Sequence, residues 1–261
     1  MSFLEPDKKL LFSDKDAATI YDGESINFVY ETKPEIVERL LPPPLEPLER
    51  PIASMYIADF PRTNFGVIYR EAALMLLCKY KEKIGVYTLS MPVDNDMAMV
   101  LGREIFGYPK KMGTIHFQKG KKQIHAWTER NGIRFIEIKA KLGMKIPEKM
   151  AIKNGLGPNK NTSFGFNFKH FIAPDVHGFD YNPRLIVQPL EFDRTSLINA
   201  KVSITMNESK DDPWTEVEIV KELGAYYNKK TTKMLHSEVV TEVEQASFVP
   251  HAFLKWDKEN I

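Results

Sequence analysis

Residues 69–91 have the sequence YREAALMLLCKYKEKIGVYTLSM, and this stretch decides how the fold is interpreted. The short polar turn Tyr80-Lys81-Glu82-Lys83 separates two apolar runs, so the pattern predicts a hairpin with strands at Tyr69–Lys79 and Ile84–Met91. The first run is apolar at nearly every position, which is typical of a strand buried on both faces. We therefore expect this strand to lie inside the fold.

Alternating runs elsewhere predict further strands that face water on one side. They are Ile26–Tyr30, Ile52–Phe60, Ile124–Thr128, Ile133–Ala140, Val202–Met206 and Trp214–Val220. Two helices are predicted, one opened by a capping box at Thr32–Glu35, the other running from an Asp94 N-cap to Phe106, before Gly107. We expect a single domain over residues 1–261 with an α+β, β-rich fold: a curled or closed antiparallel β-barrel-like sheet with a few short helices.

The charge balance of the chain excludes some classes of partner. The 261 residues carry 36 Lys and Arg against 35 Asp and Glu, so no overall positive field exists to attract nucleic acid or an anionic membrane. No apolar run is long enough to span a membrane. The one cysteine, Cys78, lies in an apolar run and cannot close an internal disulfide, so we expect a cytoplasmic protein.

Common catalytic motifs are missing from the sequence. There is no Gly-x-Gly-x-x-Gly, no P-loop and no Gly-x-Ser-x-Gly, so neither a nucleotide cofactor nor serine hydrolysis is predicted. The nearest mimic, residues 154–158, is interpreted as a loop. The six histidines form no helical pair and have no cysteine neighbours, so no metal site is predicted, and His116 and His125 are interpreted as cross-strand surface residues.

Four lysine pairs occur, and one of them has different surroundings. Lys8-Lys9, Lys121-Lys122 and Lys229-Lys230 lie in polar stretches, which favours a solvated surface for each. Lys110-Lys111 follows the largely apolar Ile105–Pro109 and precedes Met112-Gly113, just beyond a predicted helix end and in a predicted loop. From these residues alone a surface position is still the commoner one, and a buried reactive lysine is the alternative.

The helix and the lysine pair together form the pattern Asp94-Asn95-x-x-Ala98-x-x-x-Gly102-Arg103-Glu104-x-x-Gly107-Tyr108-Pro109-Lys110-Lys111. This stretch resembles the acetoacetate decarboxylase family, with weaker matches at Phe28–Thr32, Glu71, Ile198–Lys201 and Trp214. The resemblance implies a homo-oligomeric enzyme without metal or organic cofactor, acting on a small-molecule keto acid. It also implies that Lys110 forms a Schiff base with the substrate and that Glu71 positions the substrate and manages protons.

Decarboxylation of a β-keto acid explains why a lysine is needed. A protonated imine accepts the electrons that carbon dioxide leaves behind far better than a ketone does, and only a neutral amine can form that imine. A free lysine has a pKa near 10.4, so the protein must favour the neutral form. Acetoacetate decarboxylase is itself the usual example of a lysine activated by apolar surroundings or a neighbouring cation.

The surroundings of Lys110 suggest which of these two effects operates. If residues 110 and 111 are extended, their side chains point to opposite faces, so we expect desolvation to dominate and Lys111 to have a secondary or structural role in the site. Tyr108 and Met91 are expected to be apolar walls of the substrate pocket that keep the amine dry.

Several alternatives stay open for these residues. Glu71 could instead pair structurally with Arg70 or Arg103, and Arg103 could form an ion pair with Glu104. The chain also departs from the family, because Asp22–Ser25 offers no arginine and Met55 stands where a second glutamate is usual. Because Glu71 is retained, we nevertheless expect a carboxy-lyase acting on acetoacetate or a close analogue. The alternatives are a Schiff-base aldolase or dehydratase acting on a larger keto acid, or a non-catalytic β-barrel protein that binds a small molecule.

Overall fold

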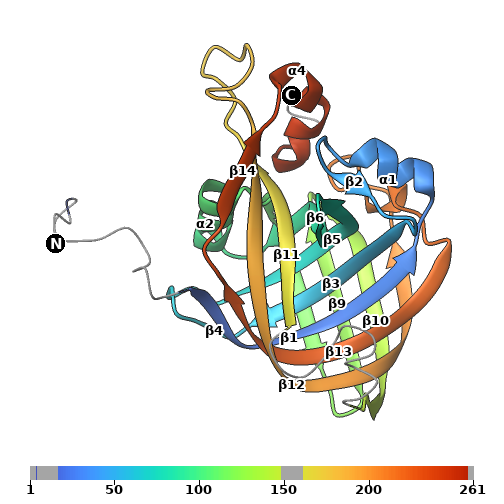
Figure 1. Ribbon diagram of the computed structural model, residues 1–261. Coiled ribbons are helices and arrows are strands. Elements are labelled where there is room, and N and C mark those ends of the chain that lie inside the picture. Colours follow the sequence, from blue (N-terminus) through green and yellow to red (C-terminus); the bar gives the residue numbers. More distant parts are fainter. Residues whose placement is uncertain (1–3, 5–16, 148–160, 258–261) are drawn as a thin grey trace.

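The computed structural model describes residues 4, 17–147 and 161–257, which fold around one extensive sheet (Figure 1). The Lys8-Lys9 pair and the predicted loop at residues 154–158 lie outside the described residues. In chain order the elements are β1 (Ala18–Glu31), α1 (Pro34–Leu40), β2 (Glu46–Pro47), β3 (Ile52–Phe60), β4 (Arg62–Thr63), β5 (Tyr69–Tyr80), β6 (Lys83–Val93), α2 (Asp96–Phe106), β7 (Lys110–Met112), β8 (Thr114–Lys119), β9 (Gln123–Arg130), β10 (Ile133–Lys145), β11 (Asn161–Lys169), β12 (Arg184–Met206), η1 (Trp214–Glu216), β13 (Lys221–Met234), β14 (Glu238–Glu242), α4 (Gln245–Phe248) and η2 (Val249–Lys255).

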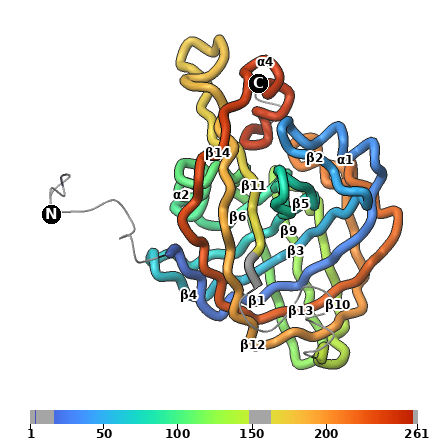
Figure 2. The backbone as a smooth tube through the Cα atoms, viewed as in Figure 1, coloured from blue at the N-terminus to red at the C-terminus, as the bar shows by residue number. Residues whose placement is uncertain are grey.

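Seven strands of this sheet close into a ring. Antiparallel pairing runs from β6 through β5, β3, β1, β13 and β12 to β11, and β11 then pairs with β6 in parallel. That last contact involves only two residue pairs, Gly165 with Val86 and Phe166 with Tyr87. The sheet is therefore curled into a ring rather than a regular barrel, and the predicted β-rich fold class is confirmed (Figures 1 and 2).

The long strand β12 connects this ring to a second layer. Its first half pairs with β11 and its second half pairs with β10, which continues through β9 to β8. The β8–β10 layer packs on β3 and β5 and encloses the main hydrophobic core, in which Phe28, Met55, Leu74 and Phe135 are nearly inaccessible. Burial of this apolar surface is the principal term that stabilises the fold.

All predicted strands except Trp214–Val220 are confirmed, but on two of them one face has different surroundings from those predicted. The buried residues of β1 and β3, such as Phe28 and Met55, face the core as the alternation predicts. Asn27, Val29 and Tyr56 on the other face line an internal cavity instead of bulk water, because the ring closes over them. The buried strand Tyr69–Lys79 and its hairpin partner are confirmed as β5 and β6, with Cys78 buried.

Both helices form, with their N-caps shifted by one residue. The capping box at Thr32 is wrong, because Thr32 continues the extended chain, its backbone N–H bonds to Pro51, and Lys33 occupies the cap position without a side-chain bond. Asp94 is likewise not the cap of α2, since its carboxylate accepts the backbone N–H of Arg70, and Asn95 caps the helix. The helix stop is confirmed, because Gly107 adopts a left-handed conformation with φ 75°.

Two further predictions are wrong. Trp214–Val220 is not a strand: after Pro213 the chain forms the turn η1, and Trp214 and Val217 both enter the core, where Trp214 packs edge-on against Phe135 at 5.3 Å. Lys110 and Lys111 do not lie in a loop, because they begin β7, which pairs in parallel with β6. Within the described ranges, no helix is long and apolar enough to cross a membrane.

Candidate active site

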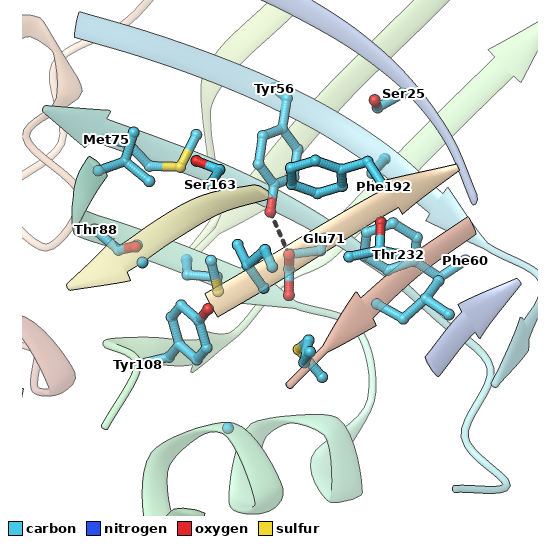
Figure 3. Close-up of a pocket in the computed structure, with 18 of the residues that line it drawn as sticks. Ser25, Tyr56, Phe60, Glu71, Met75, Thr88, Tyr108, Ser163, Phe192 and Thr232 are labelled. Carbon is cyan, nitrogen blue, oxygen red and sulfur yellow. Dashed lines mark hydrogen bonds between the residues drawn. The ribbon is translucent and has the colours of Figure 1, made fainter. Parts of the chain in front are cut away.

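A cavity of about 550 Å³ lies inside the ring of strands (Figure 3). Residues from all seven ring strands line it, and α2, β7 and the connecting residues Phe65 and Tyr108 complete the wall. Its volume lies within the range that proteins use to enclose small organic ligands. Most of its lining is apolar, with side chains such as Ile20, Phe60, Met75, Leu190, Phe192 and Met234.

Lys110 and Glu71 form a buried ion pair on the wall of this cavity. The Lys110 Nζ lies 2.8 Å from Glu71 Oε2, and each residue is only 5% exposed. Lys110 is placed by the pairing of β7 with β6, which sets it beside Met91. Its ammonium also lies 4.9 Å from the centre of the Tyr69 ring. Four of the five predicted site residues, Lys110, Glu71, Tyr108 and Met91, therefore meet at one cavity.

Tyr56 fixes the carboxylate of Glu71 from the other side. The Tyr56 hydroxyl donates to Glu71 Oε1 at 2.5 Å, so the two carboxylate oxygens have different partners (Figure 3). Burial, followed by the charge of Glu71, raises the pKa of Tyr56 well above its usual value, which keeps this donor protonated. Arg70, the structural partner considered for Glu71, pairs instead with Asp59 and Asp94.

Gly102 and Arg103 of the sequence motif explain how Lys110 reaches the cavity. A Cβ added to Gly102 would lie 2.5 Å from Lys110 Cδ, so only glycine leaves room for the lysine side chain to cross α2. The Arg103 guanidinium donates to the backbone carbonyls of Lys110 and Lys255. The expected ion pair with Glu104 is therefore wrong, because Arg103 anchors β7 to the C-terminal segment instead.

Lys111 points away from the cavity, as expected for an extended pair. Its Nζ lies 3.2 Å from Asp212 Oδ1 and 3.4 Å from Asp257 Oδ1, and it also donates to the carbonyl of Asp211. Arg130 completes this network through bonds to Asp212 and Asp257 at 2.6 and 2.9 Å. The structure therefore does not bring Lys111 together with the other predicted site residues.

Tyr108 and Met91 form walls of the cavity close to the ion pair. Tyr108 follows Gly107 at the end of α2, and its hydroxyl donates to Gln188 Oε1 at 2.5 Å. Burial, aided by the charge of Glu71, raises the pKa of Tyr108 above its usual value. The hydroxyl is thus a fixed hydrogen-bond donor, and the ring is presented as an apolar surface.

Sequence reasoning missed two cations that line the same cavity, Lys230 and Arg194. They are paired residues on the neighbouring strands β13 and β12. Burial, and to a lesser extent the charge of Arg194, lowers the pKa of Lys230 to about 7. The surface prediction is therefore wrong for Lys230, whereas Lys229 points outward toward Asp22 at 3.5 Å, and Lys121 and Lys122 are exposed as predicted.

The histidines have structural contacts. His116 stacks on Trp127 with ring centres 4.3 Å apart, and His125 Nε2 lies 2.5 Å from Glu137 Oε1. His116 is the cross-strand partner of Trp127, whereas His125 lies two residues before Trp127 on β9 and is the cross-strand partner of Gln118. Both are partly exposed, which agrees with the sequence interpretation. In the described part of the chain, no group of three His, Cys, Asp or Glu residues is arranged to hold a metal ion.

Comparison with known proteins gives relatives over nearly the whole chain. The chain is 26% identical over 246 residues to the CLA biosynthesis isomerase of Lactiplantibacillus plantarum, an alignment covering 90% of this chain and 87% of the relative. The crystal structure of acetoacetate decarboxylase from Legionella pneumophila superposes with a TM-score of 0.77 at 18% identity, covering 92% and 94% of the two chains.

A further structural neighbour is the enduracididine biosynthesis enzyme MppR, complexed with the condensation product of pyruvate and imidazole 4-carboxaldehyde. It superposes with a TM-score of 0.68 at 15% identity, covering 88% of this chain and 92% of that chain. At these identities the two structural matches establish the fold alone. The sequence model of the family Acetoacetate decarboxylase (ADC) matches residues 8–243, most of the chain. The protein therefore belongs to the acetoacetate decarboxylase family.

Proposed function

We propose that this protein is a Schiff-base decarboxylase that converts a β-keto acid to a ketone and carbon dioxide, with Lys110 as the nucleophile. One observation carries the proposal: Lys110 and Glu71 are paired at 2.8 Å within a largely apolar cavity. An amine next to a proton acceptor, both shielded from water, is the arrangement that imine formation needs. Membership of the acetoacetate decarboxylase family supports the same chemistry.

The first half of the reaction builds the imine. Lys110 Nζ transfers a proton to Glu71 and attacks the ketone carbon, which gives a carbinolamine. Loss of water, with a proton returned by Glu71, leaves the protonated imine. Tyr56 holds the Glu71 carboxylate in place through its hydrogen bond, so the proton moves between groups already within hydrogen-bonding distance.

The second half breaks the carbon–carbon bond. The bond to the carboxylate cleaves, carbon dioxide departs, and the electron pair moves through the former α-carbon to the imine nitrogen to give an enamine. That carbon then takes a proton, and water hydrolyses the imine to release the ketone and free Lys110. Tyr108 and Met91 line the apolar wall, where a carboxylate is poorly solvated and its conversion to neutral carbon dioxide is favoured.

Isomerisation is the second candidate function, and the alignment favours it. The relative aligned over 90% of this chain is named as an isomerase. The same Lys110 imine would serve that reaction: Glu71 would remove a proton next to the imine carbon, and the resulting enamine would be protonated at another carbon before hydrolysis. No carbon–carbon bond breaks in this case, so the two functions release different products.

The test measures carbon dioxide release from acetoacetate and longer 3-oxo acids, together with deuterium uptake from heavy water into the recovered ketone. We expect carbon dioxide from the native protein and from Lys121→Met, which changes an exposed lysine, and none above background from Lys110→Met. Deuterium uptake without carbon dioxide, lost in Lys110→Met, would assign the isomerase. The absence of both would overturn the Schiff-base proposal.

A further inference from the structure

The cavity contains a second cationic region away from the Lys110–Glu71 pair. Arg194 and Lys230 lie opposite each other on β12 and β13, and both line the cavity. Both also stack on Phe192: Lys230 Nζ lies 4.0 Å from the ring centre and the Arg194 guanidinium carbon lies 5.1 Å from it. Two like charges are therefore held around one aromatic ring in the cavity wall.

Nearby carboxylates do not neutralise Lys230. Asp22 pairs with Lys229 and Arg62, and Glu24 pairs with Lys119. Among the residues that the structure describes, Lys230 has no acidic partner. Burial in the apolar wall, and to a lesser extent the neighbouring Arg194, disfavours the charged form of Lys230, which lowers its pKa. An anion entering the cavity would relieve this repulsion.

The cation pair and Glu71, the partner of Lys110, lie on different strands of the ring. Glu71 is on β5 and Lys230 on β13, with β3 and β1 between them. Three strand spacings amount to about 14 Å along the sheet. In a β-keto acid the carboxylate is two bonds from the ketone carbon, so it stays beside Lys110 when the imine forms. With that carboxylate beside Lys110, a group held by Lys230 is a different or a more distant carboxylate.

The wall that connects the two regions is suited to an apolar chain. Ile20 on β1, Phe60 on β3, Leu190 on β12 and Met234 on β13 all line it. A four-carbon acid would leave most of the 550 Å³ cavity empty, whereas cavities of this size commonly enclose much larger ligands. The size of the cavity, its apolar walls and the cation pair together suit a ligand that has an apolar chain and an anionic group.

We propose that Lys230 and Arg194 bind the carboxylate of a long-chain oxo acid, with several apolar carbons between that carboxylate and the carbonyl that reacts at Lys110. The assignment of the reacting carbonyl rests on the proposed function, but the anion site itself does not. If the enzyme decarboxylates, its substrate carries a further carboxylate beside the ketone. If it isomerises, the distant carboxylate is the only one required.

The test compares two unreactive probes, octanoate and octan-1-ol, by titration calorimetry. Their chains match, so the difference in affinity isolates the charged group. We expect octanoate to bind more tightly than octan-1-ol, and Lys230→Met to weaken octanoate about tenfold while leaving octan-1-ol unchanged. Lys230→Arg should restore octanoate binding, and Lys229→Met, which changes the neighbouring outward lysine, should have no effect. Arg194→Met gives an independent variant if Lys230→Met does not fold.

Three results would overturn the proposal: equal weakening of both probes, no weakening of octanoate, or weakening by Lys110→Met instead of Lys230→Met. The last variant also separates this proposal from the proposed function. Lys110→Met should retain octanoate binding while losing all turnover, so failure of the anion site and failure of the Schiff-base chemistry give different results.

Discussion

Lys110 and Lys111 are adjacent, equally buried at 5% exposure, and each lies within 3.2 Å of a carboxylate, yet their surroundings differ completely. Lys110 pairs with the carboxylate of Glu71, and its amine lines a cavity. Lys111 faces two aspartates and a backbone carbonyl on the opposite side of β7. Burial and pairing therefore do not distinguish a reactive lysine from a structural one, whereas access to a cavity does.

The charges around Lys111 balance one another. Lys111 and Arg130 supply two cations, and Asp212 and Asp257 supply two anions, all within hydrogen-bonding or ion-pair distance. Such a network fixes β7 against β9 and the C-terminal segment, and removal of one member leaves buried charge uncompensated. One face of β7 thus provides rigidity, and the other presents the amine.

The largest effect should come from changing the partner of Lys110. Glu71→Gln keeps an acceptor for the Tyr56 hydroxyl but cannot take a proton from the amine, so kcat should fall about 10³-fold. The matched control is Glu104→Gln, because Glu104 is exposed on α2 and outside the cavity. Steady-state kinetics on both variants measures the difference. A loss smaller than about threefold in Glu71→Gln would show that Glu71 is not the proton carrier.

Lys111→Met should instead affect stability. It leaves Asp212 and Asp257 facing Arg130 alone, and breaking a buried ionic network of this kind costs about 3 kcal/mol. Urea denaturation should detect the loss, with Lys121→Met as an exposed control, and kcat per folded molecule should stay within about twofold of native. Unchanged stability with a kcat reduced about a hundredfold would mean that Lys111 takes part in the chemistry.

The smallest effect should come from Gly102→Ala. The added methyl group would overlap the Lys110 side chain, so the amine must shift away from Glu71. We expect kcat to fall about tenfold, since small displacements of a reacting group are costly. Val100→Ala on an exposed position of the same helix controls for changes in α2 itself. Equal activities in the two variants would show that Lys110 tolerates displacement.

The sequence predicts the elements that have strong periodicity and the part of the site that carries a continuous motif. The hairpin of β5 and β6 follows from its apolar runs, and Lys110 and Glu71 both follow from the resemblance to the decarboxylase family. The polar strand β13 was missed because its inward residues, such as Asn228 and Lys230, look like surface residues. Their burial depends on closure of the ring, which pairs β13 with strands distant in the sequence.

The partners of Lys111 were unpredictable for a related reason. The acceptor at Asp211 is separated from Lys111 by 100 positions, and only the fold brings the two together. The shifted N-cap of α2 has a local cause, because Asp94 and Asn95 are equally good caps in sequence. Asn95 is the cap because the Asp94 carboxylate accepts a hydrogen bond from the backbone N–H of Arg70 on the neighbouring strand.

The most direct test of the account is to map the lysine that forms the imine. The protein is incubated with acetoacetate or a longer oxo acid in the presence of borohydride, digested, and the modified peptide is identified by mass spectrometry. We predict a single adduct on Lys110, absent in Lys110→Met and retained in Lys111→Met. An adduct on Lys230, whose pKa of about 7 also leaves a neutral amine in the cavity, would contradict the account, as would no adduct with any oxo acid.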